Sequence, residues 1–336
     1  MDTITHIALG ACAGEAIAGK QLGKKALLIG AFANTIPDFD FLSNLWLDTD
    51  DSLLAHRGFT HSFLFVAITT IGMAFLFQRC YKKRSIDLNT WLWFFGIELF
   101  LHIFIDAFNA YGTGWFEPFS HYRVSFNIIF VADPFYSIWL AIATAALIIL
   151  KKESPGRRSW TRFGLGISTL YFMYCIVNKA KTDIDIKDIL QKQHVVYDKH
   201  FTTPTPLNSW LWYVVAGSDS GYYIGYYSVF DSKKQIDLHY FPQNNSLLVP
   251  VLGQEDVQHL LRFSKGFYTV EKWNDTLVFN DLRFGQMIGW YDPNEKFVFH
   301  YFLQHKKDNK LVVQRGRFAK WDTPVIRSLL KRIAGN

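Results

Sequence analysis

The sequence predicts an α-helical integral membrane domain of about five or six apolar helices, followed by a β-rich α+β domain outside the membrane. Half of the 336 residues are apolar and 17% are aromatic, and the long apolar stretches all precede residue 180. Later aromatic runs alternate with polar residues between Gly, Asn, Asp and Pro, a pattern typical of antiparallel strands. We therefore place a membrane-embedded domain at residues 1–180 and a C-terminal domain at residues 181–336.

Six apolar segments lie before this boundary. A helix of about 18–20 apolar residues crosses a hydrocarbon core of roughly 30 Å. Three segments reach that length, at residues 59–78, 91–109 and 128–150. Three are shorter, at residues 3–19, 26–36 and 163–177. Each of the first two is either a span or a half-span lying at the interface.

Basic residues gather in alternate loops between these segments. The three basic loops carry Lys20, Lys24 and Lys25; Arg79, Lys82, Lys83 and Arg84; and Lys151, Lys152, Arg157, Arg158 and Arg162. The loops between them carry only Arg57 and Arg123. The positive-inside rule places the basic loops in the cytoplasm, so the N-terminus and the C-terminal domain are expected outside.

The rest of the composition excludes several classes. The net charge of +6 does not indicate nucleic acid, because the charges sit in short loops between apolar segments. The three cysteines lie in or beside those segments without disulfide or zinc-ribbon spacing. The first twenty residues have no basic region, so we do not expect a cleaved signal peptide.

The C-terminal part predicts strands and two helices. A short amphipathic helix is expected at residues 184–192, a Pro-containing stretch follows, and a helix at residues 322–333 closes the chain. Strands of an antiparallel sheet are expected at residues 221–230, 236–241, 267–273, 275–284, 296–302 and 310–316.

Polar residues inside the apolar half carry the functional signal, because ionisable groups in membrane segments are costly and are usually functional. They are His6, Asp38, Asp40, His56, His61, His102, Asp106, His121 and Asp133. Imidazole and carboxylate are ligands that suit zinc, manganese and iron. Most of these residues fall at the predicted outer ends of their segments, which indicates one metal cluster at that face.

The spacing of two pairs favours convergence. His102 and Asp106 are four residues apart, so on a helix they share one face. Asp38 and Asp40 follow Pro37, and in an extended segment residues two apart point the same way.

The run from residue 56 to residue 62 needs a bend to bring its histidines together. His56 and His61 are five apart and diverge on a straight helix, but Gly58 offers a bend and Thr60 a helix cap. Arg57 either holds a phosphate oxygen beside the metals or pairs with an aspartate among Asp48, Asp50 and Asp51.

At these residues the sequence resembles the YdjM/YfhP-like family of membrane-bound metal-dependent hydrolases. The matching motifs are His6, the PDFD run from Pro37, the HRGFTHS run from His56, and His102 with Asp106, extended as FNAYG. The resemblance covers about residues 1–180, and the rest looks like the extra domain of the longer members. The family is similar, more distantly, to the zinc-dependent phospholipase C group, whose three-metal cluster cleaves phosphodiesters.

The resemblance implies a bacterial cytoplasmic-membrane hydrolase of a lipid or lipid-linked phosphoester, with its site outside the cytoplasm. Two or three divalent metals are expected, zinc before manganese or iron, because the ligands exceed those of one catalytic zinc. The expected ligands are His6, Asp38, Asp40, His56, His61, His102 and Asp106, and the expected catalytic residues are Asp133, His121 and Arg57.

Two other functions stay open. A metal transporter or sensor would need polar residues deeper in the membrane, and Glu98, one turn before His102, is the main candidate. A nuclease outside the cytoplasm is the other alternative. We expect no nucleic-acid partner, because the outer loops near the site nearly lack Lys and Arg. The oligomeric state and the role of the C-terminal domain are not indicated.

Overall fold

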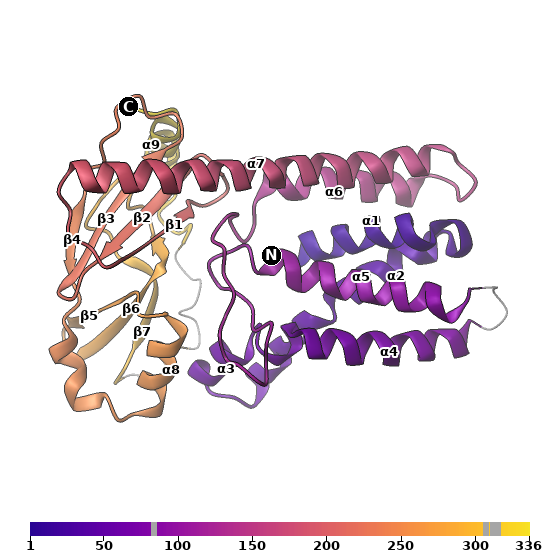
Figure 1. The fold of residues 1–336 in the computed structure, drawn as a ribbon, viewed down its shortest axis with the longest axis horizontal. Helices are drawn as coiled ribbons and strands as arrows, with labels where there is room; N and C mark the ends of the chain where they lie inside the picture. Colours follow the sequence, from indigo (N-terminus) through magenta and orange to yellow (C-terminus); the bar gives the residue numbers. More distant parts are fainter. Residues whose placement is uncertain (82–85, 305–308, 310–316) are drawn as a thin grey trace. The chain divides into compact units, whose positions relative to one another are not determined.

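The computed structural model describes residues 1–81, 86–304, 309 and 317–336 (Figure 1). The chain divides into two compact units. The first contains Met1–Leu45, Ala55–Cys175 and Pro206–Asn208, and the second contains Trp46–Leu54, Ile176–Thr205 and Ser209–Asn336. The basic residues Lys82, Lys83 and Arg84 and the strand expected at residues 310–316 lie outside the described residues.

The first unit is helical. Its elements are α1 (Thr3–Leu22), α2 (Lys24–Thr35), η1 (Pro37–Leu45), η2 (Phe59–His61), α4 (Phe63–Cys80), α5 (Leu88–Asp106), α6 (Pro134–Ile149) and the first part of α7 (Gly156–Lys192). Within the described ranges, α4 and α5 are long and apolar enough to cross a membrane, and α6 is a shorter apolar helix. The full set of five or six spans stays a prediction.

Helix α4 presents its apolar side chains outward. Ala74 is its buried residue, whereas Ile68 is 58% exposed, Ile71 52% and Phe75 59%. A helix on the surface of a water-soluble protein carries polar residues on such a face. This pattern is the one expected of a helix in contact with lipid.

Helices α1 and α2 pack with almost no space between their backbones. A Cβ atom on Gly30 would lie 2.2 Å from the carbonyl oxygen of Gly10. Small residues allow this close approach, which is common where helices pair in membranes. The contact brings His6 on α1 beside Asn34 on α2.

Helix α7 joins two elements that the sequence predicts separately. The segments at residues 163–177 and 184–192 form one helix of 37 residues, because the polar residues between them include no Gly or Pro. The predicted domain boundary after residue 180 therefore lies inside a helix whose two ends belong to different units.

The second unit contains two antiparallel sheets. The first has the order β1 (Lys199–Pro204), β2 (Leu211–Gly217), β3 (Gly221–Ser228) and β4 (His239–Pro242), and the second has the order β5 (Tyr268–Trp273), β6 (Thr276–Gln286) and β7 (Phe297–Phe302). The unit also contains η3 (Asn245–Val251), α8 (Glu255–Phe263), α9 (Thr323–Ile333) and most of α3 (Thr49–Ala55). The expected strands β3 to β7 and the closing helix α9 are confirmed.

The prediction missed β1 and β2. Strand β2 is buried along its whole length, because both of its faces are covered. Val214 packs in one core with Ile186 of α7, and Val215 packs in another with Leu282 of the second sheet. A strand covered on both faces shows no polar alternation, so period-two patterning does not reveal it.

Candidate metal centre

The last turns of α5 carry the first two residues of the site. His102 and Asp106 lie on one face of the helix, and both are fully buried. Nδ1 of His102 donates a hydrogen bond to the backbone carbonyl of Asn34 at the end of α2. The opposite ring nitrogen, Nε2, is therefore turned toward Asp106, at 3.8 Å from its Oδ2.

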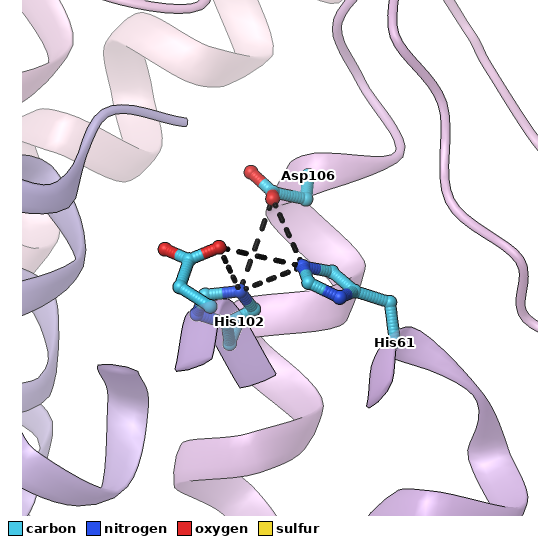
Figure 2. A group of neighbouring side chains, drawn as sticks. His61, His102 and Asp106 are labelled. Atoms are coloured by element: carbon cyan, nitrogen blue, oxygen red, sulfur yellow. Dashed lines mark hydrogen bonds and ion pairs between the residues drawn. The ribbon is translucent and has the colours of Figure 1, made fainter. Parts of the chain in front are cut away.

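The chain before α4 adds His61 and Asp38. His61 ends the short helix η2, and Asp38 lies in η1. Figure 2 shows the imidazoles of His61 and His102 converging with the carboxylate of Asp106. Helix α4 begins after Ser62, whose Oγ accepts from the Phe65 amide at 3.1 Å. Ser62 is therefore the cap, and the prediction of Thr60 as the cap is wrong.

The spacing of these four residues fits one metal ion. Their ligand atoms all lie within 4.8 Å of one another. The two Nε2 atoms are 3.1 Å apart, and Asp38 Oδ1 is 3.6 Å from that of His61 and 3.5 Å from that of His102. Ligands bound at about 2.0–2.1 Å around a tetrahedral ion lie about 3.4 Å from one another. The measured distances are close to this value.

The hydrogen bonds fix which nitrogen of each ring carries a proton. A backbone carbonyl can only accept, so His102 is protonated at Nδ1. Its Nε2 is therefore bare, that is, unprotonated with its lone pair available. The Thr60 hydroxyl donates to Asp40 at 3.0 Å, so its oxygen accepts from Nδ1 of His61, also at 3.0 Å. Nε2 of His61 is therefore bare as well, and two lone pairs face each other.

Asn34 determines which ring nitrogen of a third imidazole, that of His6, carries the proton. Its Nδ2 donates to the backbone carbonyl of Glu98 at 2.8 Å and to the side-chain Oε2 at 3.1 Å. Its Oδ1 must then accept from Nδ1 of His6, at 3.2 Å. The bare Nε2 of His6 lies 3.2 Å from Oδ1 of Asp106. The sequence analysis missed Asn34, although it is an amide inside an apolar segment.

Three bare nitrogens and two carboxylates thus meet in a buried space. Two acceptors cannot bond without a proton or a cation between them, and Oδ2 of Asp106 has no hydrogen-bond donor among the described residues. The Met1 amino group contacts Oδ1 of Asp106 and the Arg57 guanidinium contacts Oδ2, but no described contact joins either group to Nε2 of His61 or His102. Divalent cations that bind imidazole and carboxylate fit this donor set.

Asp40 lies behind His61, away from the bare nitrogens. It accepts hydrogen bonds from Nδ1 of His56 at 2.9 Å, the Arg57 amide at 2.8 Å and the Thr60 hydroxyl. The prediction of an extended segment is wrong, because η1 is a 3-10 helix with about three residues per turn, and residues two apart diverge. Asp38 and Asp40 consequently face opposite ring nitrogens of His61, Asp38 at Nε2 and Asp40 at Nδ1.

Burial and hydrogen bonding set the charges here. Burial raises the pKa of Asp40, but the hydrogen bonds from His56 and the Arg57 amide outweigh this and hold the pKa below its ordinary value. Burial lowers the pKa of His61 to about 3. The carboxylate is therefore charged and the imidazole is neutral, as metal binding requires.

Arg57 is built into the protein interior. Its Nη1 donates to Oδ1 of Asn109 at 2.9 Å, its Nε lies 3.3 Å from Oδ2 of Asp106, and it stacks on Tyr111. The described contacts pair it with Asp106, and Asp50 instead contacts His259 at 2.9 Å. Of the two roles predicted for Arg57, the ion pair with Asp48, Asp50 or Asp51 is not among the described contacts, and the guanidinium pairs with Asp106 inside the site.

The other two predicted catalytic residues make different contacts. The His121 side chain is 62% exposed and lies 2.8 Å from Glu117. Asp133 is the N-cap of α6, accepting from the Phe135 amide at 2.9 Å and from the Tyr171 hydroxyl at 2.9 Å. Among the described contacts, none joins His121 or Asp133 to the converging histidines.

The fold and the site together define a membrane protein whose helical domain carries a buried cluster of histidine and aspartate. The chain belongs to the family described as YdjM inner membrane protein, whose model matches residues 1–182. The matched residues contain every member of the candidate centre.

Two curated relatives match the same half of the chain. The uncharacterized protein YfhP of Bacillus subtilis is 34% identical over 163 residues, which are 46% of this chain and 48% of YfhP. The inner membrane protein YbcI of Escherichia coli is 27% identical over 154 residues, or 45% of this chain and 81% of YbcI. The match thus spans about half of YfhP. No solved structure matches the chain.

Proposed function

We propose that this protein is a metal-dependent hydrolase that cleaves a phosphoester of a lipid or lipid-linked substrate at the outer face of the membrane. One observation carries the proposal: the bare Nε2 atoms of His61 and His102 face each other and Oδ1 of Asp38, and no described residue donates a proton between them. A buried cluster held together by hydrogen bonds alone would have donors at these positions.

The chain offers places for more than one ion. Asp38, His61, His102 and Oδ2 of Asp106 would hold the first. Oδ1 of Asp106 faces His6 instead, so Asp106 and His6 would help to hold a second. Zinc is favoured, with manganese or iron as alternatives. Divalent ions in such sites activate water and neutralise the charge of a phosphoryl group.

Nearby residues of the chain orient this site and handle protons. Arg57 holds the carboxylate of Asp106 in place through its guanidinium. The side chain of His56 is 39% exposed, and Asp40 holds its Nδ1. Its ring centre lies 6.3 Å from that of His61. Because Nδ1 of His56 is bonded to Asp40, the other ring nitrogen, Nε2, is available. We infer that Nε2 donates a proton to the leaving group or accepts one from water.

The location of the site supports an amphiphilic substrate. Asp106 ends α5, a helix long enough to span a membrane, so we infer that the centre is near the depth of lipid head groups. The positive-inside rule, applied to the loops, supports an orientation with that end outside the cytoplasm. The distant similarity to zinc-dependent phospholipase C, which stays a prediction, favours a phosphodiester.

The direct test is hydrolysis by purified protein in lipid nanodiscs loaded with zinc, manganese or iron. The substrates are a phospholipid, a lipid-linked phosphate, a chromogenic phosphodiester and single-stranded DNA. We expect phosphoester cleavage by the wild type and by the control His239→Ala, whose histidine is in the second unit, and its loss in His61→Ala. Cleavage of DNA alone would support the nuclease alternative. Metal-loaded protein that cleaves none of the four would contradict the proposal.

One observation favours a second function, metal transport. Glu98 is fully buried in α5 and is linked through Asn34 to His6, as expected of a group that passes ions or protons toward the membrane interior. Glu98→Gln keeps an oxygen that accepts from Asn34 but removes the ionisable carboxyl group.

We expect Glu98→Gln to keep metal content and hydrolysis within about twofold of the wild type, because the Asn34 amide retains its bond to the backbone carbonyl of Glu98. The measurement pairs hydrolysis with metal uptake into proteoliposomes. Uptake by the wild type that disappears in Glu98→Gln would favour the transporter instead.

A further inference from the structure

A basic cavity lies in the first unit at the end of α1 remote from His6. Its volume is about 710 Å³, and its polar lining includes Lys20, Lys152, Ser154, Arg157, Arg158 and Arg162. The residues come from the C-terminal end of α1, the α6–α7 loop and the first turns of α7 (Figure 1). We propose that this cavity binds the phosphate groups of an anionic phospholipid.

One arginine of the lining is a fixed part of the wall. Arg157 pairs with Glu15, its Nε at 2.8 Å from Oε1 and its Nη2 at 2.6 Å from Oε2. Its Nη1 donates to the carbonyl of Leu147 at 2.7 Å, near the end of α6. Glu15 is the one acidic residue among those lining the cavity, and Arg157 engages both of its oxygens.

The remaining cations have no acidic partner within the described part of the chain. Lys20, Lys152, Arg158 and Arg162 are all exposed at the cavity. The aliphatic stem of Lys152 lies over Gly23, where an added Cβ would lie 2.9 Å from its Cδ. Four cations around one hollow repel one another. A ligand with one or more phosphates would relieve that repulsion.

Exposed apolar residues close to the cavity in sequence indicate that the cavity lies at the depth of lipid head groups in the membrane. Ile148 and Ile149, at the end of α6, are 57% and 79% exposed. Trp160 and Phe163, on α7, are 37% and 38% exposed and form an edge-to-face pair. Tryptophan beside exposed aliphatic side chains is typical of the membrane interface, and basic pockets there bind anionic head groups.

The cavity is separate from the candidate metal centre. Lys20 and His6 are on the same helix, and their separation in sequence corresponds to about 21 Å along its axis. A phospholipid bound here is therefore not the substrate of the proposed hydrolysis. The two proposals can fail independently.

The alternative is diffuse surface charge, which needs no cavity and treats all nearby lysines alike. Adjacent residues separate the two explanations, because Lys152 lines the cavity and Lys151 is exposed but does not line it. The full chain in detergent is titrated with cardiolipin, phosphatidylglycerol, phosphatidylethanolamine and inorganic phosphate, and bound molecules are counted by native mass spectrometry. The variants are Lys152→Gln, Arg158→Gln and the matched control Lys151→Gln.

We expect cardiolipin or phosphatidylglycerol to bind at least tenfold more tightly than phosphatidylethanolamine. Each cavity variant should weaken this binding about fivefold, and Lys151→Gln should leave it unchanged. Equal losses in Lys152→Gln and Lys151→Gln would overturn the proposal in favour of diffuse charge. Binding of inorganic phosphate without binding of lipid, or equal binding of all the lipids, would also overturn it.

Discussion

Replacing His102 with alanine should empty the candidate metal centre. The substitution removes a bare Nε2 that lies 3.1 Å from that of His61, and it leaves the ion with three of its four protein ligands, so we expect the ion to be lost during purification. Asp106→Ala should have a larger effect, because both oxygens of this carboxylate face imidazole nitrogens. We expect roughly two or three divalent ions per chain in the wild type and less than about one in either variant.

Elemental analysis of protein purified in detergent and reconstituted with each metal measures this effect. His239→Ala is the control, because its histidine is partly exposed in the second unit and contacts Asp237. The control should keep the full metal content. If the wild type stays empty with zinc, manganese and iron alike, the centre does not bind metal, and the converging residues must be explained as helix contacts.

Replacing Asn34 with leucine should weaken metal binding by about 10- to 100-fold without abolishing it. The variant removes the acceptor that holds the proton of His6 on Nδ1. His6 can then turn or carry its proton on Nε2, the nitrogen that faces Asp106. The loss is partial because His102 bonds to the backbone carbonyl of Asn34, which the substitution leaves in place.

A chelator competition measures this change in metal affinity. Asn178→Leu is a matched control, because Asn178 is also a buried helical amide but donates to the carbonyl of Ser209 in the second unit. Both variants should lose stability, since each leaves a buried carbonyl without its donor. Only Asn34→Leu should lose metal affinity. Equal affinity in the two variants would contradict the role given to Asn34.

Local patterns were sufficient for much of the architecture. The apolar stretches at residues 59–78 and 91–109 became α4 and α5, because uncharged runs of that length have few alternatives to a helix. The aromatic runs became β3 to β7, since alternation reports one covered face. Strand β2 has both faces covered, so its assignment depended on which elements pack against it.

The types and spacing of residues indicated most of the side chains of the candidate site, because histidine and aspartate in apolar segments are energetically costly and are usually functional. Only the tertiary structure decided what each of them does. Asp38 faces Nε2 of His61 and His102, whereas Asp40 faces Nδ1 of His61 and of His56, since a 3-10 helix separates residues that an extended chain would align. Asn34 gained its role from packing, because the contact of Gly10 with Gly30 brings α2 against α1. The protonation of each imidazole depends on partners that are distant in sequence, and these partners meet only in the folded chain.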